Sequence, residues 1–143
     1  MRKTKPKTRK EEMQILHNPD RKYIEQLQRM LDNEPGLGIT ELEYRLGADY
    51  FVAVEHDAPL GVATVVQFFD GTVELFKLYV TPAHRRHGVG IQLVNHVISE
   101  LASQNVSELV IEIVGESVRF WEQVAKSKKV QPYGNGKYGI MLA

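Results

Sequence analysis

The chain has 143 residues, 43% apolar and 25% charged, which suits one globular domain with its own core. The absence of cysteine excludes disulfides, thiolate metal sites and cysteine nucleophiles, and it favours a cytoplasmic protein. The zero net charge hides an asymmetry, because residues 1–10 carry six basic and no acidic residues and the other 133 carry 12 basic and 18 acidic. We interpret residues 1–10 as a disordered basic tail and residues 11–143 as a single domain. No apolar run approaches the length of a membrane span.

The first predicted elements are a strand and a helix. Residues 13–16 form a short apolar stretch that favours a strand. Asn18-Pro19-Asp20 is typical of a helix start, because Asn can cap free amides and Pro fits the first helical position. Apolar residues then recur at helical spacing until Pro35-Gly36 ends the helix. We expect a second, shorter helix within residues 39–46.

The middle of the chain changes to a strand pattern. β-branched and aromatic residues fill three segments separated by turn residues, at 50–55, 60–69 and 72–80. This pattern predicts a three-stranded antiparallel meander. Behind it, apolar residues at helical spacing predict an amphipathic helix over residues 89–104.

The last third of the chain predicts a strand, a helix and a hairpin. Residues 109–114 are almost continuously apolar, as in a strand buried on both faces, and residues 117–126 favour a helix. Gly134-Asn135-Gly136 predicts a hairpin between strands at 130–133 and 137–142. A strand–helix–strand crossover after an antiparallel meander implies an α/β fold, with a mixed sheet of six to seven strands and about four flanking helices.

Residues 78–91 place two glycines between the end of a strand and the start of a helix. Glycine lets the backbone approach a ligand closely, and a helix start offers unpaired N–H groups with a partial positive charge. Arg85, Arg86 and His87 add cationic groups, so the loop predicts a pyrophosphate cradle. By itself Gly-x-Gly also fits a plain strand-to-helix turn. Neither a dinucleotide fingerprint, which lacks its third glycine at Leu93, nor a P-loop matches.

The loop resembles the acyl-CoA signature of the GNAT superfamily of N-acyltransferases. That signature, Arg/Gln-x-x-Gly-x-Gly/Ala, is matched by Arg85, Gly88 and Gly90, and the Val-x-Pro that typically precedes it is matched by Val80 and Pro82. The predicted order of elements over residues 13–142 also agrees with the family. The resemblance implies a GNAT-like fold in which splayed central strands hold CoA, with acetyl-CoA as the co-substrate.

The resemblance also implies which residues contact CoA. Backbone N–H groups of residues 86–91 would bind the pyrophosphate, and the strand at residues 78–80 would bond the pantetheine arm in an opening beside residues 108–114. The implied cofactor-binding residues are Leu78, Tyr79, Val80, Arg85, Arg86, His87, Gly88, Val89, Gly90, Ile91 and Trp121. Acyl transfer in the family proceeds by direct attack of an amine on the thioester, and proximity contributes much of the rate.

Glu74 is the candidate general base. It stands eleven residues before Arg85, a spacing similar to that of the general-base glutamate in several family members. A partly buried carboxylate there could take a proton from the amine directly or through water. The alternative is a strand glutamate that faces solvent or pairs with Lys77. Tyr79, five residues later, is expected on the opposite side of the strand because side chains alternate.

The family often supplies a tyrosine that protonates the leaving thiolate, within a pattern resembling Asn-x-x-Ala-x-x-Phe-Tyr. Here Val114 stands at the asparagine position and Trp121 at the tyrosine position. An indole N–H donates a hydrogen bond but cannot give up its proton. Trp121 therefore either lines the acyl or pantetheine channel or packs in the core. The acid step would fall to Tyr133, Tyr138 or water, or the thiolate would leave unprotonated.

Three functions compete at this level. The leading hypothesis is an N-acetyltransferase for a primary amine of a small molecule, peptide or protein, and the acidic body favours a cationic acceptor. The alternative is a non-catalytic CoA-binding regulatory or interaction module. A third hypothesis places nucleic acid on residues 1–10, although a solvated tail is favoured because no aromatic residues interleave with it. The histidines have no ligand spacing, so we expect no metal site. A homodimer through the last strands fits the family.

Overall fold

A computed structural model describes residues 12–142 and shows a seven-stranded sheet with three α-helices and two 3₁₀ helices. In chain order the elements are β1 (Gln14–His17), α1 (Arg21–Asp32), β2 (Asp49–Glu55), β3 (Ala58–Gln67), β4 (Val73–Val80), η1 (Pro82–His84), α2 (Val89–Ser103), β5 (Glu108–Glu112), η2 (Gly115–Ser117), α3 (Val118–Ala125), β6 (Val130–Gly134) and β7 (Lys137–Met141). The predicted tail, residues 1–10, lies outside the described residues. No helix among those described is long and apolar enough to cross a bilayer.

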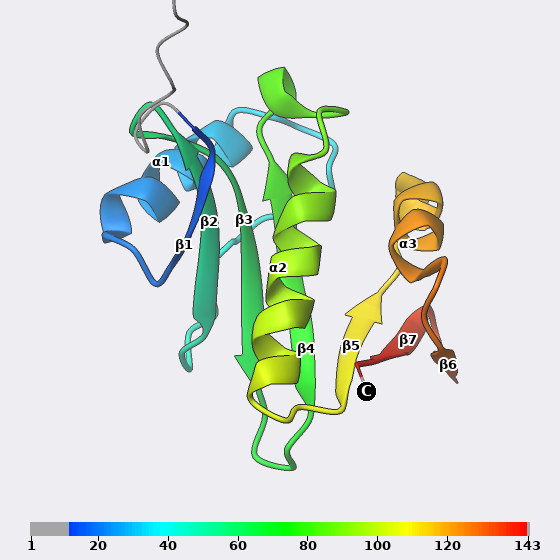
Figure 1. The fold of residues 1–143 in the computed structure, drawn as a ribbon. Coiled ribbons are helices and arrows are strands. Elements are labelled where there is room, and N and C mark those ends of the chain that lie inside the picture. Colours follow the sequence, from blue (N-terminus) through cyan, green and yellow to red (C-terminus); the bar gives the residue numbers. More distant parts are fainter. Residues whose placement is uncertain (1–11, 143) are drawn as a thin grey trace, which may run out of the picture.

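The sheet is mixed, as predicted. Its strand order is β1-β2-β3-β4-β5-β7-β6, and the pairs are antiparallel except for β4 with β5, which is parallel. The parallel pair follows from the crossover through α2, which lies across one face of the sheet in Figure 1. β5, β7 and β6 turn away from β4 together with α3 (Figure 1). The sheet is therefore continuous in its hydrogen bonding but splayed at the β4–β5 junction.

Two apolar clusters fill the two faces of the sheet. On the α2 and α3 face the cluster includes Leu93, Val97, Leu109, Trp121 and Ile140. On the α1 face it includes Ile24, Leu27, Leu42, Val62 and Tyr79. Strand β3 separates the two clusters, and its eight interior positions are all buried. The near-continuous apolar sequence of β3 is thus explained by burial on both faces.

The start of α1 differs from the predicted cap. The N-cap is Asp20, whose side chain accepts a hydrogen bond from the Lys22 N–H at 2.8 Å. Asn18 instead adopts a left-handed φ of 49°, and its side-chain oxygen accepts from the Tyr50 N–H at 2.8 Å. The asparagine therefore joins the turn before α1 to β2, while the aspartate caps the helix.

The expected second helix within residues 39–46 is wrong. The Gln28 side chain donates to the Thr40 carbonyl at 3.0 Å and accepts from the Leu42 N–H at 2.9 Å. The Thr64 hydroxyl donates to the Leu42 carbonyl at 2.7 Å, and the Leu42 side chain is fully buried. These side chains bond backbone groups that a helix would pair internally, so the segment forms bends and a turn instead of a helix.

Candidate functional site

A cleft of about 1510 Å³ runs along β4 and reaches α2 and α3. β4 and β5 are paired in register only at Glu74 and Val110, whereas β5 and β7 pair along the whole length of both strands. Beyond that single pair the two strands diverge, and side chains of both line the cleft. The splayed opening expected between these strands is present.

The first turn of α2 lies at the cleft. Gly88 is the N-cap, with φ 81° and ψ 5°, and its carbonyl accepts the first helical bond from the Gln92 N–H at 3.0 Å. The residues after it, Val89 to Ile91 in sequence, line the cleft. N–H groups in a first turn have no intrahelical partner, and they carry the positive end of the helix dipole. This geometry suits a bound phosphate.

Gly90 has a packing role in addition to its place in the loop. A Cβ built at this position would lie 3.1 Å from Phe120 Cε2 and 3.6 Å from Val80 Cγ2. The glycine therefore lets α2 approach both α3 and the end of β4 closely. The structure thus gives Gly90 a packing explanation, and phosphate binding at the same turn stays a prediction.

Arg85 is bound to the protein rather than free in the cleft. Its Nη1 lies 2.5 Å from Glu34 Oε2, its Nη2 donates to Glu34 Oε1 at 2.7 Å, and its Nε donates to the Val80 carbonyl at 3.0 Å. The Tyr79 hydroxyl donates to the same Glu34 oxygen at 3.0 Å. This network joins the loop after α1 to the loop after β4. The cationic group predicted for phosphate thus has a structural partner that sequence analysis missed.

The network changes the acidity of both of its acidic partners. The hydrogen bonds from Arg85 hold the pKa of the Glu34 carboxyl below its ordinary value of 4.5. Burial, followed by the bond to the Glu34 carboxylate, raises the pKa of Tyr79 to about 12. Tyr79 lines the cleft, but its proton is committed to Glu34.

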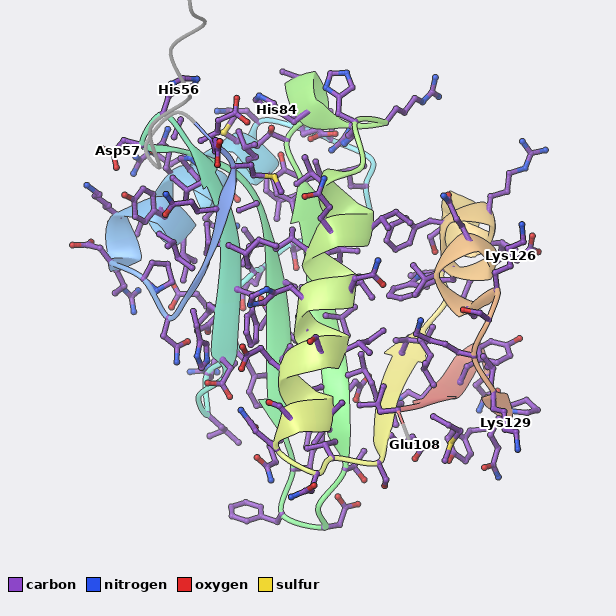
Figure 2. The ribbon with its side chains drawn as sticks, viewed as in Figure 1. His56, Asp57, His84, Glu108, Lys126 and Lys129 are labelled. Carbon is purple, nitrogen blue, oxygen red and sulfur yellow. The ribbon has the colours of Figure 1, made fainter. Side chains whose placement is uncertain are left out.

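The remaining predicted loop residues differ in their surroundings. His84 Nδ1 lies 2.7 Å from the buried Thr81 hydroxyl, and Figure 2 shows this histidine where β4 leads toward α2. Arg86 has a φ of 66° and an exposed side chain that lines the cleft. His87 is exposed and, unlike the other ten predicted CoA-contacting residues, is not part of the described cleft lining.

Glu74 lies inside the cleft, with 14% of its side chain exposed. Its Oε1 is 3.7 Å from Lys137 Nζ, so its ion-pair partner is on β7 and is not the expected Lys77. Thr64 pairs with Lys77 and Val65 with Leu75, which leaves Phe76 as an extra residue in β4.

This bulge reverses the alternation of side chains along β4. One face of β3 carries every second residue, Val62, Thr64 and Val66. Their partners on β4 are Tyr79, Lys77 and Glu74. Tyr79 therefore lies on the same face as Glu74, and the prediction of opposite faces is wrong. Glu74 and Tyr79 are five residues apart, which would place them on opposite faces of a regular strand. The extra residue Phe76 between them brings both to the same face.

Trp121 both packs in the core and lines the cleft. It is 6% exposed within the cluster under α2 and α3, and it also lines the cleft. Its ring meets Phe120 edge-on, with centroids 5.0 Å apart. Of the candidate acids, Tyr138 packs against the same apolar cluster and the Tyr133 hydroxyl donates to Glu108. Neither tyrosine is among the described residues that line the cleft.

We predict that Glu34→Gln destabilises the protein in a pH-dependent manner. The pKa of Glu34 is lowered on folding, so its stabilising effect is complete above the ordinary value of 4.5 and is lost as the pH falls below it. The wild type should melt higher than the variant at neutral pH, and the two curves should converge in acid. Glu43→Gln is the control, because it removes an exposed pair with Arg21. A difference in melting temperature that persists unchanged in acid would contradict the network's role.

Comparisons with known proteins agree with this geometry. Residues 11–125 match the model of the acetyltransferase (GNAT) family. The fold is similar to a GNAT-family acetyltransferase from Staphylococcus aureus Mu50, with a TM-score of 0.68, 14% identity and coverage of 92% of this chain and 100% of that one. No curated protein matches the sequence.

Two other solved structures are similar over most of their length. The ribosomal-protein-S18-alanine N-acetyltransferase from Escherichia coli has a TM-score of 0.66 and 16% identity, with 91% of each chain covered. The yncA protein of Salmonella typhimurium, solved with its cofactor acetyl-CoA, has a TM-score of 0.62 and 19% identity, again with 91% of each chain covered.

The mixed sheet, splayed at the β4–β5 junction, and the cleft along β4 agree with the family match. With the family match, the chain belongs to the GNAT acetyltransferase family. The residues present suit acetyl-CoA, since the cleft combines an open helix start for the pyrophosphate with the splayed edge of β4 for an extended arm. Among the described residues, no group of three or more His, Asp or Glu side chains is placed to hold a metal ion.

Proposed function

We propose that the protein is an N-acetyltransferase that moves the acetyl group of acetyl-CoA directly to a primary amine, with Glu74 as the general base. The observation that carries the proposal is a carboxylate, 14% exposed, in a cleft whose lining also includes the first turn of α2. Because Glu74 and Val110 form the one register pair between β4 and β5, this carboxylate lies where the two strands begin to separate.

The proposed binding mode relies on backbone groups. The first turn of α2 would hold the pyrophosphate, and the pantetheine arm would follow residues 78–80 toward Glu74. Arg85 contributes by fixing the loop to Glu34 and Val80, while Arg86 is the exposed cation of the loop that lines the cleft. Trp121 supplies an apolar wall.

The proposed reaction needs a base before an acid. Glu74 accepts a proton from the acceptor ammonium, the neutral nitrogen attacks the thioester carbonyl, the C–N bond forms and the C–S bond breaks. The described cleft lining offers Tyr79 as its tyrosine, and that hydroxyl is bonded to Glu34 with its pKa raised to about 12. We therefore propose that the second proton lost from the nitrogen reaches the thiolate through water rather than through a side chain.

The acceptor is proposed only as a primary amine of a small molecule, peptide or protein. A cytoplasmic location and a homodimer likewise stay predictions. Incubation of the protein with acetyl-CoA and a panel of amines, followed by detection of released thiol, tests the proposal. We expect amine-dependent release of CoA. Measurable acetyl-CoA binding with no release above buffer would instead support a CoA-binding regulatory module.

The regulatory alternative rests on one observation, the tryptophan at the position where the family often has its acid. A binding module would hold acetyl-CoA as tightly as an enzyme, and Glu74 would serve it only as the partner of Lys137. The wild type and a Glu74 variant would then both show no acetyl transfer.

A further inference from the structure

Lys137 places a primary amine beside the carboxylate of the proposed base. Its Nζ lies 3.7 Å from Glu74 Oε1, and both side chains line the cleft. Lys137 pairs with Glu112 on β5, two residues beyond Val110, which pairs with Glu74. These positions share one face of the sheet. The ammonium of Lys137 thus occupies the place next to the carboxylate that an acceptor ammonium has to take.

We propose that Lys137 is a self-acetylation site, to which the cleft transfers the acetyl group of its own bound acetyl-CoA. The inference rests on the proposed function, because it uses the same base and the same acetyl donor. It adds an acceptor within the chain, so that the modification proceeds in cis. A lysine held beside the base has a high effective concentration there, which favours an intramolecular step.

The chemical step balances without a further reactant. Glu74 takes one proton from the Lys137 ammonium, and the neutral Nζ attacks the thioester carbonyl carbon. The C–N bond forms, the C–S bond breaks and CoA leaves as a thiolate. The second proton lost from the nitrogen passes to the thiolate through water, which yields acetyl-lysine and free CoA. Glu74 then releases its proton to solvent.

The surroundings of two other lysines, Lys77 and Lys22, can be compared with those of Lys137. Lys77 lines the same cleft, and its Nζ lies over the Phe76 ring, 4.7 Å from the centroid. Lys22 forms a similar carboxylate pair, 3.8 Å from Asp57 Oδ2, and its side chain is 59% exposed against 47% for Lys137. Asp57 lies on the β2–β3 turn, and in the sheet β2 is separated from β7 by three strands (Figure 2).

Acetylation of Lys137 would change the cleft itself. An acetyl-lysine is neutral, so the ion pair with Glu74 is lost. The carboxylate then faces an incoming acceptor without an internal competitor. An added acceptor amine should accordingly slow the modification, since it competes for the same bound acetyl group.

The test is peptide mass spectrometry of the full chain after incubation with excess acetyl-CoA and no added amine. We expect Lys137 to gain an acetyl group at least ~100-fold faster than Lys22, as an intramolecular reaction beside a base should. The modified fraction at a given time should not depend on protein concentration. Equal rates at the two lysines would overturn the proposal, because Lys22 is the more exposed of the pair.

Variants test whether the modification of Lys137 needs Glu74 and whether it proceeds within one chain. Glu74→Gln should slow acetylation of Lys137 by ~100-fold and leave that of Lys22 unchanged, and Lys137→Arg should keep the charge without the modification. A Glu74→Gln rate equal to wild type would overturn the inference. An isotope-labelled Glu74→Gln chain mixed with wild type should remain unmodified at Lys137, and its acetylation at the wild-type rate would refute a reaction in cis.

The result also separates this inference from the proposed function. Transfer to added amines with no acetyl group on Lys137 would overturn the inference and leave the acetyltransferase proposal standing. Transfer to neither acceptor would overturn both. Acetylation of Lys137 that depends on Glu74 supports both, even before the natural acceptor is identified.

Discussion

Glu74→Gln should lower kcat/KM for acetyl transfer by ~100-fold or more, because glutamine keeps the shape of the side chain but cannot accept the proton of an ammonium. The affinity for acetyl-CoA should change little, since the proposed pyrophosphate site lies at the other end of β4, at the start of α2. Steady-state kinetics together with calorimetric titration of acetyl-CoA measure both quantities. An unchanged rate would remove Glu74 from the mechanism.

Two controls distinguish loss of the base from loss of the ion pair. Lys137→Met removes the same pair from its other side and leaves the carboxylate in place without its internal competitor, so transfer to an added amine should be kept or rise. Glu108→Gln makes the same charge change on the neighbouring strand, where the side chain accepts a bond from Tyr133 and is outside the described cleft lining. Equal losses in Glu74→Gln and Lys137→Met would show that the pair, and not the base, matters.

Much of the fold could be predicted because its signals are local. The apolar run of β3, the helical spacing in α2 and the Gly134-Asn135-Gly136 turn each lie within one short segment. The two residues between the strands, Asn135 and Gly136, both adopt positive φ, as a two-residue type I′ turn requires. A single crossover after the meander predicted a mixed sheet, and the parallel pairing of β4 with β5 in an otherwise antiparallel sheet confirms it.

The misses concern contacts between distant segments. Glu34 and Arg85 are 51 residues apart, and Glu74 and Lys137 are on strands separated along the chain by α2, β5, α3, β6 and two 3₁₀ helices. No periodicity marks such pairs. The bulge at Phe76 is equally silent in the sequence, yet it decides which side chains share a face with Glu74. The absent helix within 39–46 depends on Gln28, which lies on a different element.

In the candidate site, too, the local loop motif was predicted and the contact with a distant segment was not. The loop motif located the α2 start and its glycines, and the structure brings ten of the eleven predicted CoA-contacting residues to one cleft. The motif did not show that the Arg85 guanidinium is held by Glu34, so the proposed pyrophosphate site depends on the loop backbone and on Arg86. The backbone conformation of the loop should therefore govern the affinity for CoA.

Gly88→Val should weaken acetyl-CoA binding by ~10-fold or more, because a β-branched residue in the left-handed region costs about 1–3 kcal/mol. Gly88 has a φ of 81°, and the nearest atom to a Cβ built there is Gln92 Nε2 at 3.8 Å. A Cβ at this position therefore meets its nearest described neighbour only at ordinary contact distance, and the expected effect comes from the backbone conformation. If the variant loop leaves the left-handed conformation to avoid the strain, it has to return to that conformation when acetyl-CoA binds. The free energy of that return raises the Kd.

Gly88→Asn is the matched control, because asparagine tolerates the left-handed conformation while adding a side chain at the same place. It should bind acetyl-CoA nearly as well as the wild type. Thermal melting of both variants shows how much strain the fold itself retains, and CoA without its acetyl group should follow the same order of affinity. If Gly88→Val binds as tightly as Gly88→Asn at equal stability, the pyrophosphate does not depend on this turn, and the backbone cradle has to be placed elsewhere along the cleft.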